Sequence, residues 1–320
     1  MKQHLLFFSL ILLLAASCSD PDYGDYRQAL RSGNPRMISR YIRESDAPRR
    51  SARAARKLER MYYRRANSVP ACSRYLEKYP EGKYVEKIKE RREDLMFKNI
   101  GESVFAVREY LREYPQGKYR NHPRVRESAD KVRELTRKLR PAEIDSLLQK
   151  VKNTEALPVE ENEYAIIETR FGRMKMRFFP EKAPQHCANF KRLAESGYYD
   201  GVTFHRIIPG FMIQGGDINS RDGNRRTDGT GGPGYTIDAE FNDIPHEPGI
   251  VSMARTPDPN SAGSQFFICD GSPHQLNGQY TVFGEIIDGK HIIGKIAAEP
   301  RDGTDNPRRP VYMRVYMVKE

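Results

Sequence analysis

The chain has 320 residues, more than the usual single domain of about 100–200 residues, which predicts two domains. With 38% hydrophobic and 30% charged residues and a mean hydropathy of -0.75, it has the composition of a soluble globular protein with two modest cores. The net charge of +11 is uneven, because residues 19–150 hold 33 Lys and Arg against 20 Asp and Glu, whereas residues 151–320 hold 20 against 23. Acids are interleaved with the bases, which favours solvated helix faces over contact with an anionic partner.

Residues 1–17 have the pattern of a cleaved leader. One charge, Lys2, precedes an apolar run from Leu5 to Ala16 that is too short to span a bilayer. The run ends in LAASC at residues 14–18, which resembles the lipobox of bacterial lipoproteins, where the cysteine becomes the lipidated first residue. We therefore expect a signal peptide over residues 1–17, a lipid anchor on Cys18 and a place on the periplasmic or outer-membrane face of a bacterial cell envelope. An ordinary secretory signal is the alternative.

Three further cysteines, Cys72, Cys187 and Cys269, remain after the leader. An odd number cannot pair completely within one chain. Cys187 falls in a helical pattern and Cys269 in a strand, so both fit small buried apolar residues. We expect no disulfide framework.

Residues 18–156 are predicted to form a helical-repeat domain. YLEKYPEGKY at residues 75–84 recurs as YLREYPQGKY at residues 110–119, and a weaker copy begins at Tyr41. A period of about 34 residues resembles that of tetratricopeptide-type helical hairpins. Stacked hairpins present a groove for a protein partner or act as a spacer. Tyr79 and Tyr114 fit a helix core better than such a groove.

Short β-prone runs separated by Gly, Pro, Asn and Asp begin after a linker over residues 154–163. We place the boundary near residue 157 and a second domain over residues 157–320. A hairpin is predicted over residues 164–179 and a helix over residues 183–196, with Pro184 in its first turn. Further strands are expected at 204–207, 212–216, 251–254, 266–269, 281–286 and 311–318. Many short strands with two helices favour a closed barrel, which has no exposed edge.

Four ordered motifs in this half resemble those of the cyclophilin-type peptidyl-prolyl cis/trans isomerases. They are FHRIIPGFMIQGGD at residues 204–217, GIVSMAR at 249–255, GSQFFIC at 263–269 and LNGQYTVFG at 276–284. The resemblance implies a closed eight-stranded antiparallel barrel capped by two helices, with an active groove on one outer face. It implies an isomerase that acts on proline-containing unfolded or flexible polypeptides without a cofactor or metal.

The chemistry of X-Pro rotation explains why such a site needs neither nucleophile nor metal. Rotation breaks amide resonance and costs about 18–20 kcal/mol, while the cis and trans forms of X-Pro differ little in free energy. A catalyst needs a pocket for the proline ring, anchors for the flanking backbone and a donor aimed at the prolyl nitrogen, which becomes basic as the bond twists.

The resemblance assigns these roles to particular residues. Arg206 is the expected donor, and Gln265 is expected to orient it. Gln214 matches the anchor of a substrate carbonyl, and Ala254 and Arg255 match backbone contacts. The proline pocket corresponds to Phe211, Met212, Phe267, Leu276 and Tyr280. Strand alternation predicts that Phe266, rather than Phe267, points into the core.

Three positions depart from the common family pattern. Gln275 replaces the usual Trp, Tyr280 replaces the usual His, and Arg255 stands where Asn is most frequent. The loss of the indole predicts weaker binding of the inhibitor cyclosporin. The glycine-rich segment 229–234 lacks the Lys and the strand-to-helix context of a phosphate loop.

Two functions compete on this sequence. The main hypothesis is a lipid-anchored isomerase that assists the folding of envelope or secreted proteins. The alternative is a non-catalytic module that binds Pro-containing segments as a chaperone or scaffold. No nucleic-acid partner is expected, because no recognised motif accompanies the basic charge.

Overall fold

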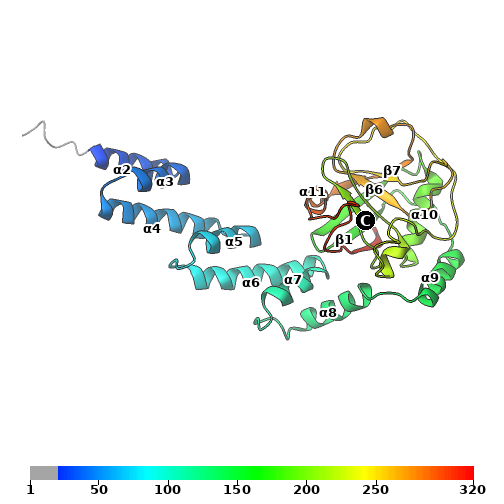
Figure 1. Ribbon diagram of the computed structural model, residues 1–320, viewed down its shortest axis with the longest axis horizontal. Helices are drawn as coiled ribbons and strands as arrows, with labels where there is room; N and C mark the ends of the chain where they lie inside the picture. The colour runs from blue at the N-terminus through cyan, green and yellow to red at the C-terminus, as the bar shows by residue number, and fades with distance from the viewer. Residues whose placement is uncertain (1–20) are drawn as a thin grey trace, which may run out of the picture. The chain divides into compact units, whose positions relative to one another are not determined.

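A computed structural model describes residues 21–320, which form two compact units, one that ends at Met96 and one over Phe97–Glu320 (Figure 1). The predicted signal peptide and Cys18 lie outside the described residues. The boundary predicted near residue 157 marks the change from helix to strand. The helices from residue 97 to that point share a compact unit with the sheet.

The first unit is helical. It contains α2 (Pro21–Ser32), α3 (Pro35–Glu44), α4 (Pro48–Arg65), α5 (Val69–Lys78) and most of α6 (Val85–Glu102). Proline begins α2, α3 and α4, where its fixed φ suits a first turn and its missing N–H would have had no helical partner. The side chains of Asn34 and Ser68 accept backbone N–H bonds at the starts of α3 and α5.

The repeated tyrosines adopt the same local structure in both copies. The Tyr75 hydroxyl accepts the N–H of Tyr84 at 3.2 Å, and 35 residues later the Tyr110 hydroxyl accepts that of Tyr119 at 3.0 Å. Tyr84 and Tyr119 also stack on aromatic rings, Tyr63 and Phe97 respectively, with centroids 4.2 and 4.0 Å apart. Tyr79 packs on Tyr62 and Tyr75, as expected of a core residue.

The second unit continues with α7 (Ala106–Glu113), α8 (Pro123–Leu135) and α9 (Pro141–Asn153). Just before α7, Ser103 Oγ donates to the carbonyl of Thr169 at 2.8 Å, and the N–H of Val104 donates to the buried carboxylate of Glu168 at 2.7 Å. From α9, Val151 is fully buried in the same core as the strands. This helical segment therefore forms part of the structure that supports the sheet.

Eight antiparallel strands form one sheet in the order β3-β4-β6-β5-β7-β2-β1-β8. In chain order they are β1 (Glu163–Thr169), β2 (Gly172–Phe178), β3 (Arg206–Ile208), β4 (Met212–Gly215), β5 (Ile250–Met253), β6 (Phe266–Cys269), β7 (Val282–Asp288) and β8 (Met313–Lys319). All eight lie within two residues of the predicted positions, because Gly, Pro, Asn and Asp turns delimit the β-prone runs.

The sheet curls without closing, so the predicted closed barrel is wrong. Within residues 21–320 the edge strands β3 and β8 share no ladder, and β3 is only three residues long. The two edges meet instead just before these strands, at an isolated bridge between Thr203 and Tyr312 and a bond from the N–H of Phe204 to the carbonyl of Val311. The result is a half-barrel.

Two helices, α10 (Pro184–Glu195) and α11 (His291–Ala297), cover the inner face of the sheet (Figure 1). Phe190 of α10 contacts Phe178, Phe266 and Phe283, and Ile293 and Ile296 of α11 complete the core. Two short 3-10 turns, η1 (Ile218–Arg221) and η2 (His274–Leu276), lie in loops. Cys72, Cys187 and Cys269 are buried and unpaired in the described chain.

Candidate active site

A row of side chains crosses the outer face of the half-barrel. Strand register places Arg206 of β3 opposite Gln214 of β4, Gln214 opposite Phe267 of β6, and Phe267 opposite Ser252 of β5. Directly opposite residues of neighbouring strands point to the same face of a sheet. Phe266 points into the main core and Phe267 into a separate outer cluster, which confirms the alternation predicted for this pair.

A small pocket opens on this row. Its volume is about 140 Å³, the size of one small ring, and Met212 and Phe267 at its base are only 2% and 5% exposed. The pocket brings together nine of the ten groove residues that the sequence predicted, which are Arg206, Phe211, Met212, Gln214, Ala254, Arg255, Phe267, Leu276 and Tyr280. Residues far apart in sequence thus converge on one apolar cavity with a cation at its rim.

The ring of Phe267 is held between two other rings. His246 stacks on it with centroids 5.8 Å apart, and Tyr280 meets it edge-on at 5.9 Å. His246 is itself fixed, because its ring nitrogens contact Asn277 at 3.0 Å and Ser252 at 3.1 Å. This support was not predicted, since His246 lies in a loop outside the four motifs.

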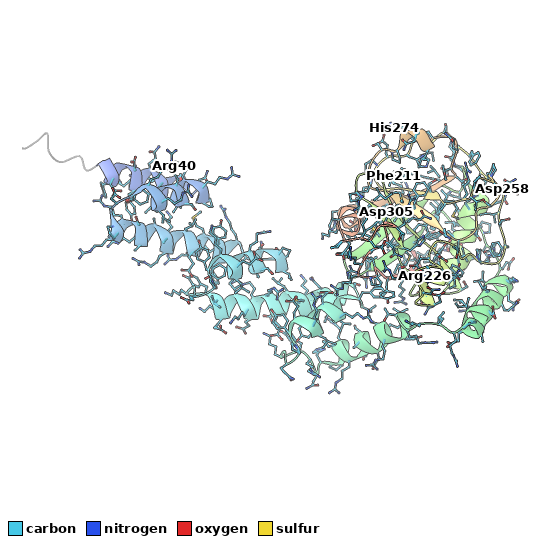
Figure 2. The ribbon with its side chains drawn as sticks, viewed as in Figure 1. Arg40, Phe211, Arg226, Asp258, His274 and Asp305 are labelled. Carbon is cyan, nitrogen blue, oxygen red and sulfur yellow. The ribbon has the colours of Figure 1, made fainter. Side chains whose placement is uncertain are left out.

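Arg206 stands exposed on the edge strand. Its Nε lies 4.0 Å from the carboxylate of Asp305, and the carbonyl of Asp305 accepts the N–H of Ile207 at 2.9 Å. Figure 2 shows Asp305 and Phe211 on the barrel unit. Asp305 has a φ of 62°, a left-handed conformation that Asp adopts more readily than most residues. No motif marks this neighbour, which comes from a loop about 100 residues away.

Gln265 makes no hydrogen bond to Arg206 within the described chain. Its Oε1 accepts from Gln214 Nε2 at 3.1 Å, and its own Nε2 donates to the carbonyls of Gly229 and Gly231 at 2.9 Å each. The side chain beside Arg206 is therefore Gln214, and Gln265 joins Gln214 to the glycine-rich loop.

That loop borders a second and larger cavity of about 710 Å³. Residues 229–236 form one wall, and the cavity shares Gln214, Ala254 and Arg255 with the smaller pocket. Two adjoining cavities with a common wall can hold a proline ring and the residues that precede it in an extended peptide.

Arg255 lies at the junction of the two cavities. Its guanidinium stacks on the ring of Tyr280 at 4.5 Å and donates to the carbonyls of Gln279 and Thr256. These bonds and the stacking hold the side chain in place at the site where the family most often has Asn.

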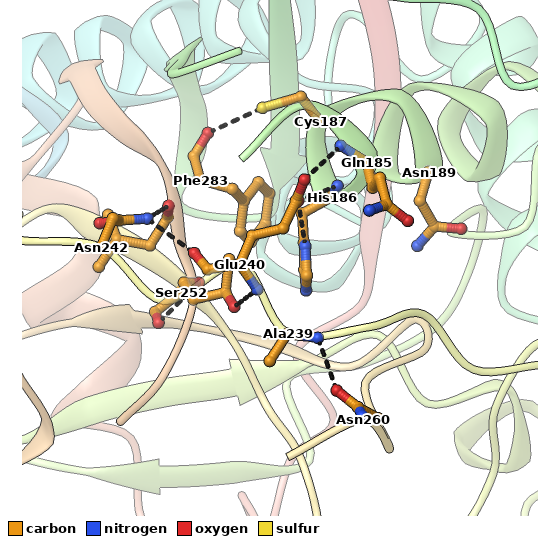
Figure 3. Close-up of polar contacts among 12 residues, drawn as sticks. Gln185, His186, Cys187, Asn189, Ala239, Glu240, Asn242, Ser252, Asn260 and Phe283 are labelled. Carbon is orange, nitrogen blue, oxygen red and sulfur yellow. Dashed lines mark hydrogen bonds and ion pairs between the residues drawn. The ribbon is translucent and has the colours of Figure 1, made fainter. Parts of the chain in front are cut away.

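A half-buried carboxylate, Glu240, holds the loop that leads to the pocket in place. Glu240 accepts the N–H groups of Gln185 and His186 at the start of α10, and its Oε2 lies 2.6 Å from His186 Nδ1 (Figure 3). Asn242, two residues on, donates to the carbonyl of Val282 at 2.9 Å. The same loop then places Ile244 in the outer cluster around Phe267.

The arrangement suits electrostatic work on a neutral substrate. A charged donor, a small apolar pocket and an amide anchor lie within one groove. Arg206 cannot serve as a base, since a guanidinium keeps its proton at any ordinary pH.

Comparison with known proteins finds relatives of one family. Residues 164–318 match the model of the family described as cyclophilin type peptidyl-prolyl cis-trans isomerase/CLD. A peptidyl-prolyl cis-trans isomerase of Synechococcus elongatus is 45% identical over 139 residues, 43% of this chain and 89% of the relative. Peptidyl-prolyl cis-trans isomerase B of Bacillus subtilis is 46% identical over 119 residues, 37% of this chain and 78% of the relative. The crystal structure of a Cryptosporidium parvum cyclophilin type isomerase aligns with a TM-score of 0.46 and 34% identity over 49% of this chain and 98% of its own.

Proposed function

This chain belongs to the cyclophilin-type peptidyl-prolyl cis-trans isomerases, and we propose that it accelerates X-Pro rotation in the groove formed by Arg206, Gln214 and Phe267. As the bond twists, the prolyl nitrogen loses conjugation with the carbonyl, and its lone pair becomes localised and able to accept a hydrogen bond. A donor aimed at that nitrogen binds the twisted state more tightly than either planar state and lowers the barrier.

The main evidence for this assignment is the register across β3, β4 and β6. It places the cation, the amide and the aromatic ring in one row beside a cavity of about 140 Å³. The proline ring occupies the cavity, Arg206 donates to its nitrogen, and Gln214 holds the carbonyl that precedes it. The backbone next to Ala254 and Arg255 binds the chain before proline.

A protease-coupled assay on a proline-containing peptide tests the activity. The full chain should accelerate the slow isomerisation phase, and Arg206→Ala should remove most of that acceleration. Arg226→Ala is the matched control, since Arg226 is an exposed arginine of the same unit that lines neither cavity (Figure 2). An Arg206→Ala protein as active as the control would contradict the assignment.

We also propose that Cys18 is lipidated and holds the enzyme at a bacterial envelope membrane, where its substrates are envelope or secreted proteins that expose X-Pro segments. The LAASC motif supports the anchor. Within residues 21–320 no helix is long and apolar enough to cross a membrane. Cys18→Ala should move the protein from the membrane to the soluble fraction at high salt, where ionic contacts with headgroups are screened; membrane association that survives high salt would count against lipidation.

The helical segment is proposed to be a tetratricopeptide-like array that acts as a spacer or recruits a protein partner. The equivalent hydrogen bonds at Tyr75 and Tyr110, 35 residues apart, support a repeated hairpin. Deletion of a repeat that changes which clients are folded, but leaves peptide isomerisation intact, would assign the array to recruitment. A deletion without effect on clients would assign it to spacing.

A further inference from the structure

Helix α4 carries a line of arginines along its outer face. Arg49, Arg53, Arg56, Arg60 and Arg64 are all exposed, and we call them the arginine stripe. Their spacing of four, three, four and four residues keeps them within about 80° of one another around the helix. From end to end the stripe is about 22 Å long, at about 1.5 Å per residue.

The stripe lies opposite the buried face of the helix. Ala54 and Leu58 are 0% and 5% exposed and pack into a small core with residues of α2 and α3. They project roughly 140° from the centre of the stripe, since successive residues turn by about 100°. The five guanidinium groups therefore point away from α2 and α3.

The charge of the stripe is not neutralised by the chain. None of its five arginines forms an ion pair, hydrogen bond or ring contact with any of residues 21–320. Some cations elsewhere in the helical region do pair with acids one turn away, as in Arg40–Glu44 and Arg133–Asp130. The single acid of α4, Glu59, accepts the hydroxyl of Tyr75 instead.

We propose that the arginine stripe docks on the anionic headgroups of a phospholipid bilayer. A straight row of like charges on a rigid helix complements a flat anionic surface, and arginine donates well to phosphate oxygens. The other exposed residues between Arg49 and Arg64 are Ala52 and Lys57. The two aromatic residues of this range, Tyr62 and Tyr63, are half-buried and pack on Tyr79 and Tyr84, so no exposed aromatic or amide side chain lies there to contact nucleic-acid bases.

The position of the stripe in the chain favours a membrane over other anionic partners. Arg50, in the first turn of α4, pairs with Asp22 in the first turn of α2 at 2.7 Å. Cys18 precedes α2 by three residues, which can span at most about 11 Å. This part of the inference rests on the anchor proposed above, because a lipid on Cys18 would hold the start of α4 beside the headgroups.

The test uses the unlipidated chain from Ser19 to Glu320, so that it does not depend on the anchor. Its binding to vesicles of phosphatidylglycerol mixed with phosphatidylcholine is measured by co-sedimentation. We expect binding to the mixed vesicles that weakens with salt, and none to pure phosphatidylcholine. Equal binding to both vesicle types, or to neither, would overturn the proposal.

Two triple variants separate the stripe from overall charge. Arg53→Gln, Arg56→Gln and Arg60→Gln together should weaken vesicle binding on the order of 100-fold, from the usual contribution of each cation near an anionic surface. Arg36→Gln, Arg43→Gln and Arg65→Gln remove the same charge from exposed arginines of the same unit outside the stripe, and should weaken it only a few-fold. Equal losses in the two variants would contradict a specific docking face.

Further measurements separate a loss of docking from misfolding, from binding to nucleic acid and from a loss of isomerase activity. Arg53→Lys, Arg56→Lys and Arg60→Lys together should bind as the wild type does, and circular dichroism should show the same helix content in all variants. Tighter binding to a DNA or RNA oligonucleotide than to the mixed vesicles would overturn the membrane assignment. Isomerase activity of the glutamine stripe variant should equal that of the wild type, so loss of docking and loss of catalysis are separate results.

Discussion

The Arg206 side chain is exposed, and its charge is accessible to a substrate. Its closest ion-pair partner, Asp305, is 4.0 Å away, so the guanidinium keeps N–H groups for a substrate. Gln214 lies opposite it in the ladder and is itself held by Gln265. The site therefore consists of one accessible donor, Arg206, beside a Gln214 side chain that is held in place by a hydrogen bond.

Arg206→Ala should lower kcat/KM for a proline peptide by about 10²–10³-fold, the usual effect of removing one preorganised donor. Arg206→Lys should recover part of the loss, because lysine keeps the charge without the planar fork. The free energy of unfolding should change by less than about 0.5 kcal/mol, as the side chain is exposed. Peptide kinetics and urea unfolding of the wild type, Arg206→Ala and Arg206→Lys measure these effects on rate and stability. A large stability loss in Arg206→Ala would show that its effect on rate is indirect.

His205, next to Arg206, predicts a dependence of stability on pH. Burial lowers the pKa of His205 from 6.5 to about 4, and burial also lowers the pKa of His186 and His246. Between pH 6.5 and about 4 the unfolded chain binds a proton at position 205 that the folded chain does not. The free energy of unfolding should therefore fall as the pH falls through this window, by up to about 1.4 kcal/mol per pH unit from His205.

Urea unfolding at several pH values between 7 and 5 checks this expectation. His205→Asn removes the titrating group, so the slope of stability against pH should become shallower than in the wild type. An identical slope in both proteins would exclude His205 as a source of the dependence.

At the scale of elements, α9 is part of the catalytic unit. Val151 is fully buried in the sheet core, Ile144, Leu147 and Leu148 pack against it, and Lys150 donates to the carbonyl of Ser196 at 2.6 Å. A fragment that begins near residue 157 lacks all of these contacts, whereas one that begins at Phe97 keeps them.

Val151→Ala should lower the free energy of unfolding by about 2 kcal/mol, from lost burial and the cavity that remains. Leu157→Ala is the control, since Leu157 is 46% exposed and should change stability by less than about 0.5 kcal/mol. Urea unfolding followed by the near-ultraviolet signal of the barrel compares the two. Equal effects would mean that α9 adds nothing to the barrel.

The repeated tyrosines make a paired prediction. Tyr75→Phe and Tyr110→Phe each remove a hydroxyl that accepts a backbone N–H, and each should cost about 1 kcal/mol of unfolding free energy. The Tyr75 hydroxyl also donates to Glu59 at 2.7 Å, so Tyr75→Phe removes both of these hydrogen bonds. Thermal unfolding of both variants measures the costs; a neutral result at both positions would contradict a structural role for the repeated hydroxyl.

At the scale of the whole molecule, the features that could be predicted from the sequence are those with a local signal or a motif. The strands followed from β-prone runs between turn residues, and the nine pocket residues followed from the resemblance carried by four ordered motifs. The sequence patterns did not reveal Asp305, His246 or the contact between the sheet and the segment before α7. Each of these joins distant segments of the chain and leaves no periodic pattern. Closure of the sheet was predicted wrongly for the same reason, since edge pairing depends on how far β3 and β8 extend.

The groove is expected to catalyse rotation and not merely to bind proline. Exchange NMR on a proline-containing peptide tests it directly, because it reports binding and cis/trans exchange in one sample. The wild-type chain should produce exchange cross-peaks between the cis and trans forms. Arg206→Ala should still shift the peptide resonances but give almost no exchange; cross-peaks of wild-type intensity from that variant, or none from the wild type, would contradict the account.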